Sequence, residues 1–312
     1  MDTKRIEELK QQYGAEIIDN GLRLHPQDFL DEVDWRDQID PHFTRTWLEF
    51  TYGGLFTRHL LDDRTRLLVA IAQLLSKGEY EEMERQIPSA LTSGATPREV
   101  LEIVLQATVY IGYVRASRGA RLCVKVFERL GCLDEIKRTR LPLESNRACR
   151  SLASERTQWP AAKSPEEAAL REQFLEKYGW QSVSSRIRLQ SHQGYETMKS
   201  YDRLDPHYLQ LWLDFIYGEM YPRGVVDDRT RLLVMVGICL AMNEPVQLDN
   251  HIRGAMLLGA TPREVLEVIV HSTVYVGMPT TVLTVRNLER IARDLGRYDE
   301  LLPETPSPSE AV

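Results

Sequence analysis

A stripe of acid, imidazole and phenol side chains marks one segment near the carboxyl end of the chain. Glu264, Glu267, His271 and Tyr275 follow one another at spacings of three and four residues. Residues at these spacings share one face of an α-helix. Such a stripe is suited to proton transfer if it faces a pocket. His251 stands upstream, in the helical segment 248–258.

The pattern argues against a metal or a nucleotide cofactor. His251 and His271 are far apart, and the chain contains neither H-x-x-x-H nor H-x-x-E-H. It also lacks a glycine-rich phosphate loop and a dinucleotide fingerprint. We therefore expect no metal ion and no cofactor.

Helix start signals indicate how these side chains are positioned. Thr261 suits an N-cap, Pro262 the first helical position, and Glu264 the third residue of a capping box. Segment 227–242 has a broad apolar face behind two aspartates, which suit a helix N-terminus. No strand pattern of convincing length occurs, and valine-rich 273–277 lies within a helical run. The sequence predicts an all-α fold.

The chain repeats itself with an offset of 165 residues. DDRTRLLV at 62–69 recurs without change at 227–234, and GATPREVLE at 94–102 recurs at 259–267. The register needs no gap between the matching blocks, so we interpret the chain as a tandem duplication. We expect a first repeat at 1–135, a linker at 136–165, a second repeat at 166–300 and a disordered tail at 301–312.

Composition narrows the classes of partner. The net charge of -7 argues against nucleic acid or an anionic membrane, while 43% hydrophobic residues suffice for a core in each half. Charged residues interrupt every apolar run, and the N-terminus lacks a secretory h-region, so a cytoplasmic location is expected. The four cysteines form no C-x-x-C pair and are expected to be free thiols.

Taken together, the motifs of the second repeat resemble those of the carboxymuconolactone decarboxylase family. Their order is R-x-R-x-L-V, N-E, L-x-x-H, G-A-T-x-x-E-V-x-E-V and H-x-x-x-Y-x-G-x-P, and they cover most of each repeat. The residues that carry them are Arg229, Arg231, Asn243, Glu244, Leu248, His251, Gly259, Thr261, Glu264, Glu267, His271, Tyr275, Gly277 and Pro279. The resemblance implies two tandem copies of an alkylhydroperoxidase-D-like helical domain.

The chain departs from that family in two ways. Related peroxidases place a C-x-x-C four residues ahead of the histidine, where this chain has Glu244 and Gln247, so thiol peroxidase chemistry is excluded. The first repeat carries Gln86 and Gln106 where the second carries histidines. The second repeat therefore has the better-kept site, although a glutamate expected at position 247 occurs only in the first repeat, as Glu82.

By family position we expect the catalytic residues to be His251, Glu244, Glu267 and His271, with Glu244 or Glu267 orienting His251. We expect substrate binding by Arg231, Arg229, Tyr275, Glu82 and Arg66, with Glu82 or Arg66 approaching His251 from the other repeat. Structural roles compete with several of these assignments. Glu264 most simply serves the capping box, and the arginines would equally suit ion pairs with nearby aspartates.

The resemblance implies a cofactor-independent decarboxylase, lyase or isomerase that acts on a small conjugated carboxylic acid or lactone. The alternative is a non-catalytic ligand-binding or assembly protein that has kept the fold. The resemblance implies that single-repeat members assemble as hexamers. Three tandem chains would then supply six repeats and form a closed pseudo-hexamer. We therefore expect a homotrimer with pockets near repeat boundaries.

Overall fold

The fold was analysed in a computed structural model that describes residues 3–26, 28–141, 159–190 and 195–303. All regular elements within these ranges are helical, which confirms the expected all-α class. The first half comprises α1 (Thr3–Tyr13), α2 (Ala15–Leu24), α3 (Phe29–Ile39), α4 (Pro41–Leu48), the π-helix η1 (Glu49–Leu55), α5 (Asp63–Lys77), α6 (Tyr80–Thr92), α7 (Pro97–Gln106), α8 (Thr108–Arg129) and α9 (Leu133–Arg138).

The second half repeats this order with the same offset of 165 residues. It comprises α11 (Pro165–Tyr178), α12 (Trp180–Gln190), α13 (Tyr195–Leu204), α14 (Pro206–Leu213), the π-helix η3 (Asp214–Met220), the 3₁₀ turn η4 (Tyr221–Arg223), α15 (Asp228–Met242), α16 (Pro245–Leu257), α17 (Pro262–His271), α18 (Thr273–Val276), α19 (Met278–Asp294) and the 3₁₀ turn η5 (Tyr298–Leu301). Most of the expected linker, and the tail from residue 304, lie outside the described residues.

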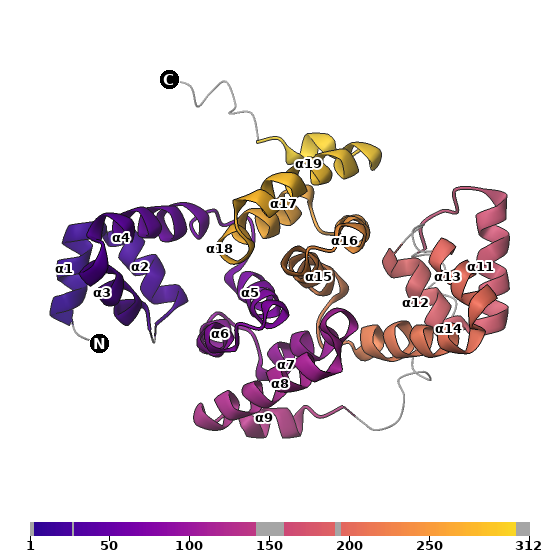
Figure 1. The fold of residues 1–312 in the computed structure, drawn as a ribbon, viewed down its shortest axis with the longest axis horizontal. Coiled ribbons are helices and arrows are strands. Elements are labelled where there is room, and N and C mark those ends of the chain that lie inside the picture. Colours follow the sequence, from indigo (N-terminus) through magenta and orange to yellow (C-terminus); the bar gives the residue numbers. More distant parts are fainter. Residues whose placement is uncertain (1–2, 27, 142–158, 191–194, 304–312) are drawn as a thin grey trace.

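Helices α5 and α15 pack against each other at the centre of the molecule (Figure 1). An added Cβ at Gly237 would lie 2.7 Å from the side chain of Val69, so the glycine permits this close approach. The Gln73 amide donates to the Gly237 carbonyl at 3.3 Å and to the Ser272 hydroxyl at 2.7 Å, so it joins the two repeats.

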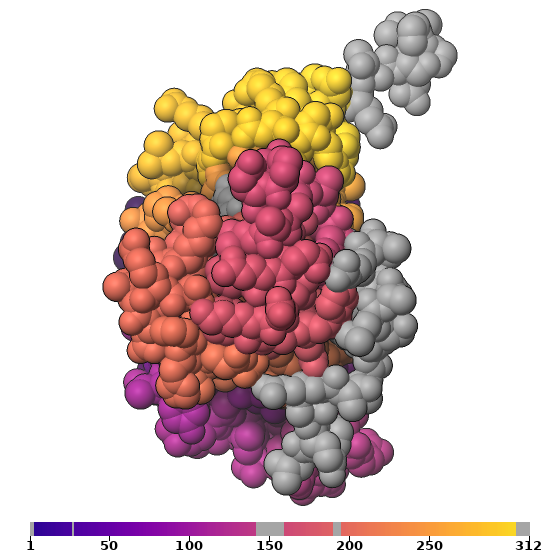
Figure 2. All heavy atoms as spheres, turned by 90° about the vertical axis from the view of Figure 1, so that its right-hand side faces the viewer, coloured from indigo at the N-terminus to yellow at the C-terminus, as the bar shows by residue number. Residues whose placement is uncertain are grey.

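The two N-terminal helical groups lie on opposite sides of that centre, α1–α4 on one and α11–α14 on the other (Figure 1). The second group rests between the first repeat and α19 on the face shown in Figure 2. One continuous apolar core runs through both halves. No helix within the described ranges is long and apolar enough to cross a membrane.

Capping and a glycine turn place the first turn of α8 and the short helix α18. Thr96 and Thr261 form the capping boxes with Glu99 and Glu264 that start α7 and α17. Beyond α7, the helical path breaks at Gly112, whose φ of 77° favours glycine; Gly277 repeats the break with a φ of 80°. The short stretches between these points carry Tyr110 and Tyr275 across to the other repeat.

Candidate active site

Each repeat contains a cavity whose wall is completed by the other repeat. The second-repeat cavity, of about 390 Å³, lies among α12, α14, η3 and α16 and is closed by Tyr110 from the first repeat. The first-repeat cavity, of about 140 Å³, is its counterpart among α2, α3, η1 and α6 and is closed by Tyr275. A pocket between repeats is therefore formed within one chain.

His251 is joined to the second-repeat cavity through a tyrosine of the first repeat. The side chain of His251 is fully buried on α16, and its Nε2 is hydrogen-bonded to the Tyr110 hydroxyl. The two rings meet edge to face at 5.5 Å. Tyr110 lines the cavity, whereas Nδ1 of His251 has no hydrogen-bond partner among the described residues. The phenol thus stands between the imidazole and the cavity.

Burial keeps both members of this pair uncharged. Desolvation, assisted by the positive charge of Arg186, lowers the pKa of His251 to about 3. Desolvation also raises the pKa of Tyr110 well above its usual value, although Arg186 opposes that shift. At neutral pH the pair is a neutral imidazole beside a neutral phenol.

The rest of the second-repeat cavity combines one cation with aromatic surface. Arg186, on α12, lines the wall, and its guanidinium lies 5.6 Å from the centre of the Tyr217 ring. Trp212 and Tyr221 extend the aromatic wall, with Tyr221 stacked on Tyr217. A flat, conjugated anion matches such a surface, because guanidinium pairs with carboxylate and aromatic faces accept planar groups.

His271, on α17 of the same repeat as His251, lies beside the first-repeat cavity rather than the second-repeat cavity. Its ring contacts Phe56 at 5.4 Å and Tyr275 at 5.2 Å. Burial and the charge of Arg66 lower the pKa of His271 well below its usual value. Of the acid–imidazole–phenol stripe, the Tyr275 phenol thus lines the first-repeat cavity and the His271 imidazole lies against it.

Two buried carboxylates clamp the repeats together. Glu267 accepts hydrogen bonds from Arg58 at 2.7 Å and from Arg66 at 3.1 Å, and its side chain is fully buried. Glu102 makes the reciprocal contacts, with Arg223 at 2.8 Å and Arg231 at 3.4 Å. Reciprocal contacts of this kind relate the halves by an approximate twofold axis.

The clamps change the expected roles of three residues. Glu267, Arg66 and Arg231 are committed to ion pairs between repeats, and both arginines are almost fully buried. Arg231 also donates to the Gln106 amide oxygen at 2.6 Å. These residues hold the walls of the cavities in place.

Further expectations about the surroundings of His251 are corrected by the structure. Glu244 is exposed at the start of α16 and does not contact His251, while Glu82 lines the first-repeat cavity. Arg229 pairs with Glu264 across a partly exposed contact, whereas the structural alternative had expected nearby aspartates as its partners. The approach of one repeat to the histidine of the other does occur, but Tyr110 makes it.

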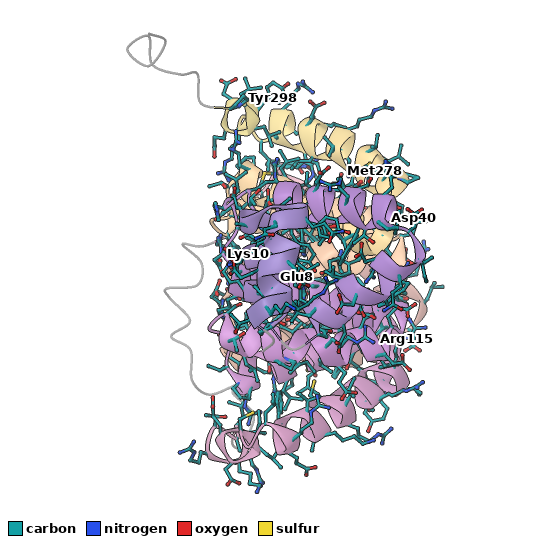
Figure 3. The ribbon with its side chains drawn as sticks, turned by 90° about the vertical axis from the view of Figure 1, so that its left-hand side faces the viewer. Glu8, Lys10, Asp40, Arg115, Met278 and Tyr298 are labelled. Carbon is teal, nitrogen blue, oxygen red and sulfur yellow. The ribbon has the colours of Figure 1, made fainter. Side chains whose placement is uncertain are left out.

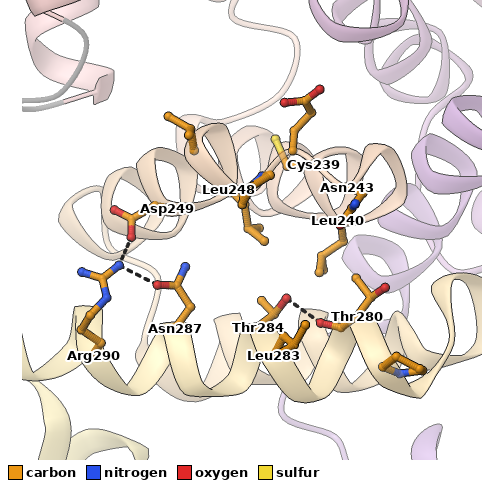
Figure 4. Close-up of a pocket in the computed structure, with 14 residues that line it drawn as sticks. Cys239, Leu240, Asn243, Leu248, Asp249, Thr280, Leu283, Thr284, Asn287 and Arg290 are labelled. Atoms are coloured by element: carbon orange, nitrogen blue, oxygen red, sulfur yellow. Dashed lines mark hydrogen bonds and ion pairs between the residues drawn. The ribbon is translucent and has the colours of Figure 1, made fainter.

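Glu244 belongs instead to a groove of about 640 Å³ between α16 and α19 (Figure 4). Arg290 there donates to Asn287 at 2.6 Å and pairs with Asp249. In the first repeat Arg118 and Tyr80 stand at the positions of Leu283 and Pro245, and the Arg118 guanidinium lies 4.1 Å from the centre of the Tyr80 ring. The groove is the larger hollow, but it contains no imidazole or phenol, so we do not assign the chemistry to it.

Sequence reasoning missed Arg186 and the partner of His251. Arg186 has Gly21 at the matching position of the first repeat, so the repeat gave no signal for it. Arg58 and Arg223 do recur in register and could have been recognised as a pair. Tyr110 recurs in register with Tyr275, but its contact with His251 depends on packing between repeats.

The comparisons with known proteins agree with the duplicated architecture. The sequence model of the carboxymuconolactone decarboxylase family matches residues 41–124 and 206–289, more than half of the chain, with the same offset. A 4-carboxymuconolactone decarboxylase of Acinetobacter baylyi is 32% identical over 82 residues, which are 26% of this chain and 61% of that protein. The chain thus spans about three fifths of the length of that relative.

Two other relatives are similar over comparable lengths. An uncharacterised 15.0 kDa protein of Paracoccus denitrificans is 28% identical over 102 residues, covering 31% of this chain and 76% of the relative. A nitrosuccinic acid decarboxylase of Metarhizium robertsii is 29% identical over 73 residues, covering 23% of this chain and 51% of the relative.

Proposed function

Since the chain belongs to the carboxymuconolactone decarboxylase family, we propose that it is a cofactor-independent carbon–carbon lyase or isomerase for a small conjugated carboxylic acid or lactone. The observation that carries this proposal is the His251–Tyr110 pair at the wall of the second-repeat cavity. Relatives named as decarboxylases support the reaction type.

Arg186 binds an acidic group of the substrate in this proposal. The guanidinium offers a planar fork of donors, and the neighbouring rings suit a flat conjugated chain. In a decarboxylation, the carboxylate that leaves should not be the one paired with arginine, because that pair would stabilise the ground state. Arg186 therefore binds a second acidic group or the lactone carbonyl.

Tyr110 supplies the proton that replaces the departing carboxylate. Loss of CO₂ breaks the carbon–carbon bond and leaves its electron pair on the substrate as a dienolate. The Tyr110 hydroxyl then protonates carbon, and the phenolate regains its proton from water. His251 acts through Tyr110, because Nε2–H donation to the phenol oxygen leaves the phenolic hydrogen directed at the substrate and stabilises the phenolate.

Single and double substitutions test this assignment with 4-carboxymuconolactone as the first substrate. We expect Tyr110→Phe and His251→Gln each to lower kcat by roughly 10²–10⁴-fold, with a smaller change in KM. The double variant should be little worse than either single variant, because the two residues act as one unit. The exposed His207 provides a control, and His207→Gln should retain activity.

Additive losses in the double variant would contradict action through Tyr110. If no small unsaturated acid or lactone is turned over, although such acids bind and Arg186→Gln abolishes their binding, the non-catalytic ligand-binding alternative is correct.

A further inference from the structure

We propose that the first-repeat cavity is a second ligand site, which binds a small protonated amine. It stands independently of the reaction proposed for the second-repeat cavity. The two cavities occupy equivalent places in the duplicated fold, but the chain has given their walls opposite charge.

The charge difference rests on four positions of the cavity wall at which the two repeats carry different residues. Asp28, Glu32 and Glu82 line the first-repeat cavity, together with Arg36. The second-repeat cavity has Thr197 and Gln247 at the places of Glu32 and Glu82, and no carboxylate lines it among the described residues. A buried cation such as ammonium is therefore favoured in the first-repeat cavity and disfavoured in the second.

The first-repeat cavity also has no room for a counterpart of Arg186, the arginine of the second-repeat cavity. Gly21 occupies the position of Arg186, and an added Cβ there would lie 2.1 Å from the ring of Phe29. Phe29 fills the space that a longer side chain would need. The cavity thus has no counterpart of the guanidinium that we assign to anion binding.

Two arginines only partly neutralise the carboxylates. Arg85 lies 3.0 Å from Glu82, 2.7 Å from Glu32 and 3.7 Å from Asp28, while Arg36 pairs with Glu32. Three negative groups therefore share two positive ones. Burial raises the pKa of Asp28 and of Glu82, and neighbouring carboxylates add to both shifts. A further cation would relieve that cost.

Aromatic faces line the same cavity. Trp47, Tyr52, Phe56 and Tyr275 all contribute to its wall, and the Trp47 and Tyr52 rings meet edge to face at 5.5 Å. The Arg36 guanidinium already lies over Trp47, 4.2 Å from the ring centre. Such walls attract organic cations through the negative face of each ring.

An orphaned acceptor specifies a cation that can donate hydrogen bonds. Gln86 lines the cavity with only 7% of its surface exposed, and its Oε1 has no hydrogen-bond partner among the described residues. His25, also in the wall, is kept neutral because burial lowers its pKa to about 4. A protonated amine satisfies the Gln86 carbonyl, whereas a quaternary ammonium does not. The volume of about 140 Å³ limits the ligand to a few heavy atoms.

Ethylammonium is a suitable probe, with ethanol as its uncharged isostere and acetate as its charge opposite. The full chain would be titrated while the Trp47 indole ¹⁵N resonance, assigned from Trp47→Phe, is followed. We expect a saturable shift with ethylammonium in the millimolar range, the range open to so small a ligand. Ethanol and acetate should give no saturable shift of this resonance.

Matched variants localise the effect. Glu82→Gln, which installs the residue type of the second repeat, should raise Kd for ethylammonium at least fivefold, and Gln86→Leu should do the same. Glu84→Gln alters a carboxylate that pairs with Arg129 outside this cavity, and should leave Kd unchanged. An equal response to ethanol, no saturable response to ethylammonium, or an unchanged Kd in both cavity variants would overturn the proposal.

Discussion

His251 differs from a typical acid–base histidine because its surroundings keep it neutral. An exposed imidazole changes charge near pH 6.5, but complete burial and the charge of Arg186 lower the pKa of His251 to about 3. The ring is then a hydrogen-bonding group of fixed charge at physiological pH. Its contribution lies in positioning and polarising Tyr110, the residue that reaches the cavity.

The pH dependence of catalysis should reveal this state. We expect kcat/KM to stay level between about pH 5 and 8, because neither His251 nor Tyr110 changes charge in that window. Steady-state rates in buffers of constant ionic strength provide the measurement. A limb with an apparent pKa near 6.5 in the wild-type protein would indicate a solvent-exposed catalytic histidine instead.

Residue identities could be read from the sequence more readily than residue partners. The histidines and Tyr275 were recognisable from spacing and family position, and all of them lie in or beside a cavity wall. Their positions relative to the cavities could not be read in this way, since the structure places His251 and His271 beside different cavities. Spacing within one helix cannot show that Tyr110, 141 positions away, crosses the repeat boundary to reach His251.

At the level of elements, local signals were strong enough to place the helices. The offset of 165 residues, the capping boxes at Thr96 and Thr261, and the aspartate N-caps of α5 and α15 all recur in the structure. These devices depend on neighbours within four residues, so a single sequence reveals them. The clamps at Glu102 and Glu267 depend on contacts between repeats and could not be read this way.

Breaking one clamp should destabilise the protein far more than weakening a cap. Glu267→Gln removes the negative charge shared by Arg58 and Arg66, of which Arg66 is almost fully buried. We expect a loss of about 3–5 kcal/mol in the free energy of unfolding, the usual cost of an uncompensated buried charge. Urea denaturation followed by circular dichroism measures it.

Glu264→Gln is the control for this change. Glutamine can still complete the capping box, and the partly exposed pair with Arg229 contributes little, so we expect a loss below about 1 kcal/mol. Equal losses in the two variants would mean that the clamp is dispensable. Glu102→Gln tests the reciprocal clamp and should behave like Glu267→Gln.

At the scale of the molecule, the two halves are partners in a single structure. One apolar core crosses between them, and each cavity depends on a tyrosine from the other half. Three buried histidines, His25, His251 and His271, stand where the other repeat has glutamine. Divergence therefore placed titratable groups in a shared core that must keep them neutral.

These histidines should make the fold sensitive to acid. Burial lowers the pKa of His25 to about 4, so between about pH 6.5 and 4 the unfolded chain binds a proton that the folded chain does not. The contribution of the neutral histidine to the free energy of unfolding is thus complete above pH 6.5. It is lost as the pH falls, by about 1.4 kcal/mol per pH unit for each such histidine. His25→Gln should reduce this slope by that amount, while His207→Gln, on the surface, should leave it unchanged. Identical slopes in wild type and His25→Gln, measured by urea denaturation at several pH values, would refute the argument.

The assembly of whole chains gives the last prediction. We propose a homotrimer, in which three chains of 36.0 kDa place six repeats in a closed ring. Large apolar side chains are exposed just after the two glycine turns, with Val114 82% and Met278 55% exposed. Arg115, just beyond the Gly112 break in α8, and Met278, the first residue of α19, lie toward the same edge of the molecule in Figure 3. That edge is the contact we expect between chains, because burying it would remove apolar surface from water.

Light scattering at several concentrations should therefore give a mass of three chains, and Val114→Lys should reduce it to one. Glu128→Lys, an exposed change at the far end of α8, should leave the trimer intact. A wild-type mass of one or two chains at every concentration would refute the trimer without affecting the fold. Both cavities are lined by residues of a single chain, so we expect the dissociated Val114→Lys protein to keep the activity of the second-repeat cavity. Loss of activity on dissociation, with the helices still folded, would instead mean that a neighbouring chain completes that cavity.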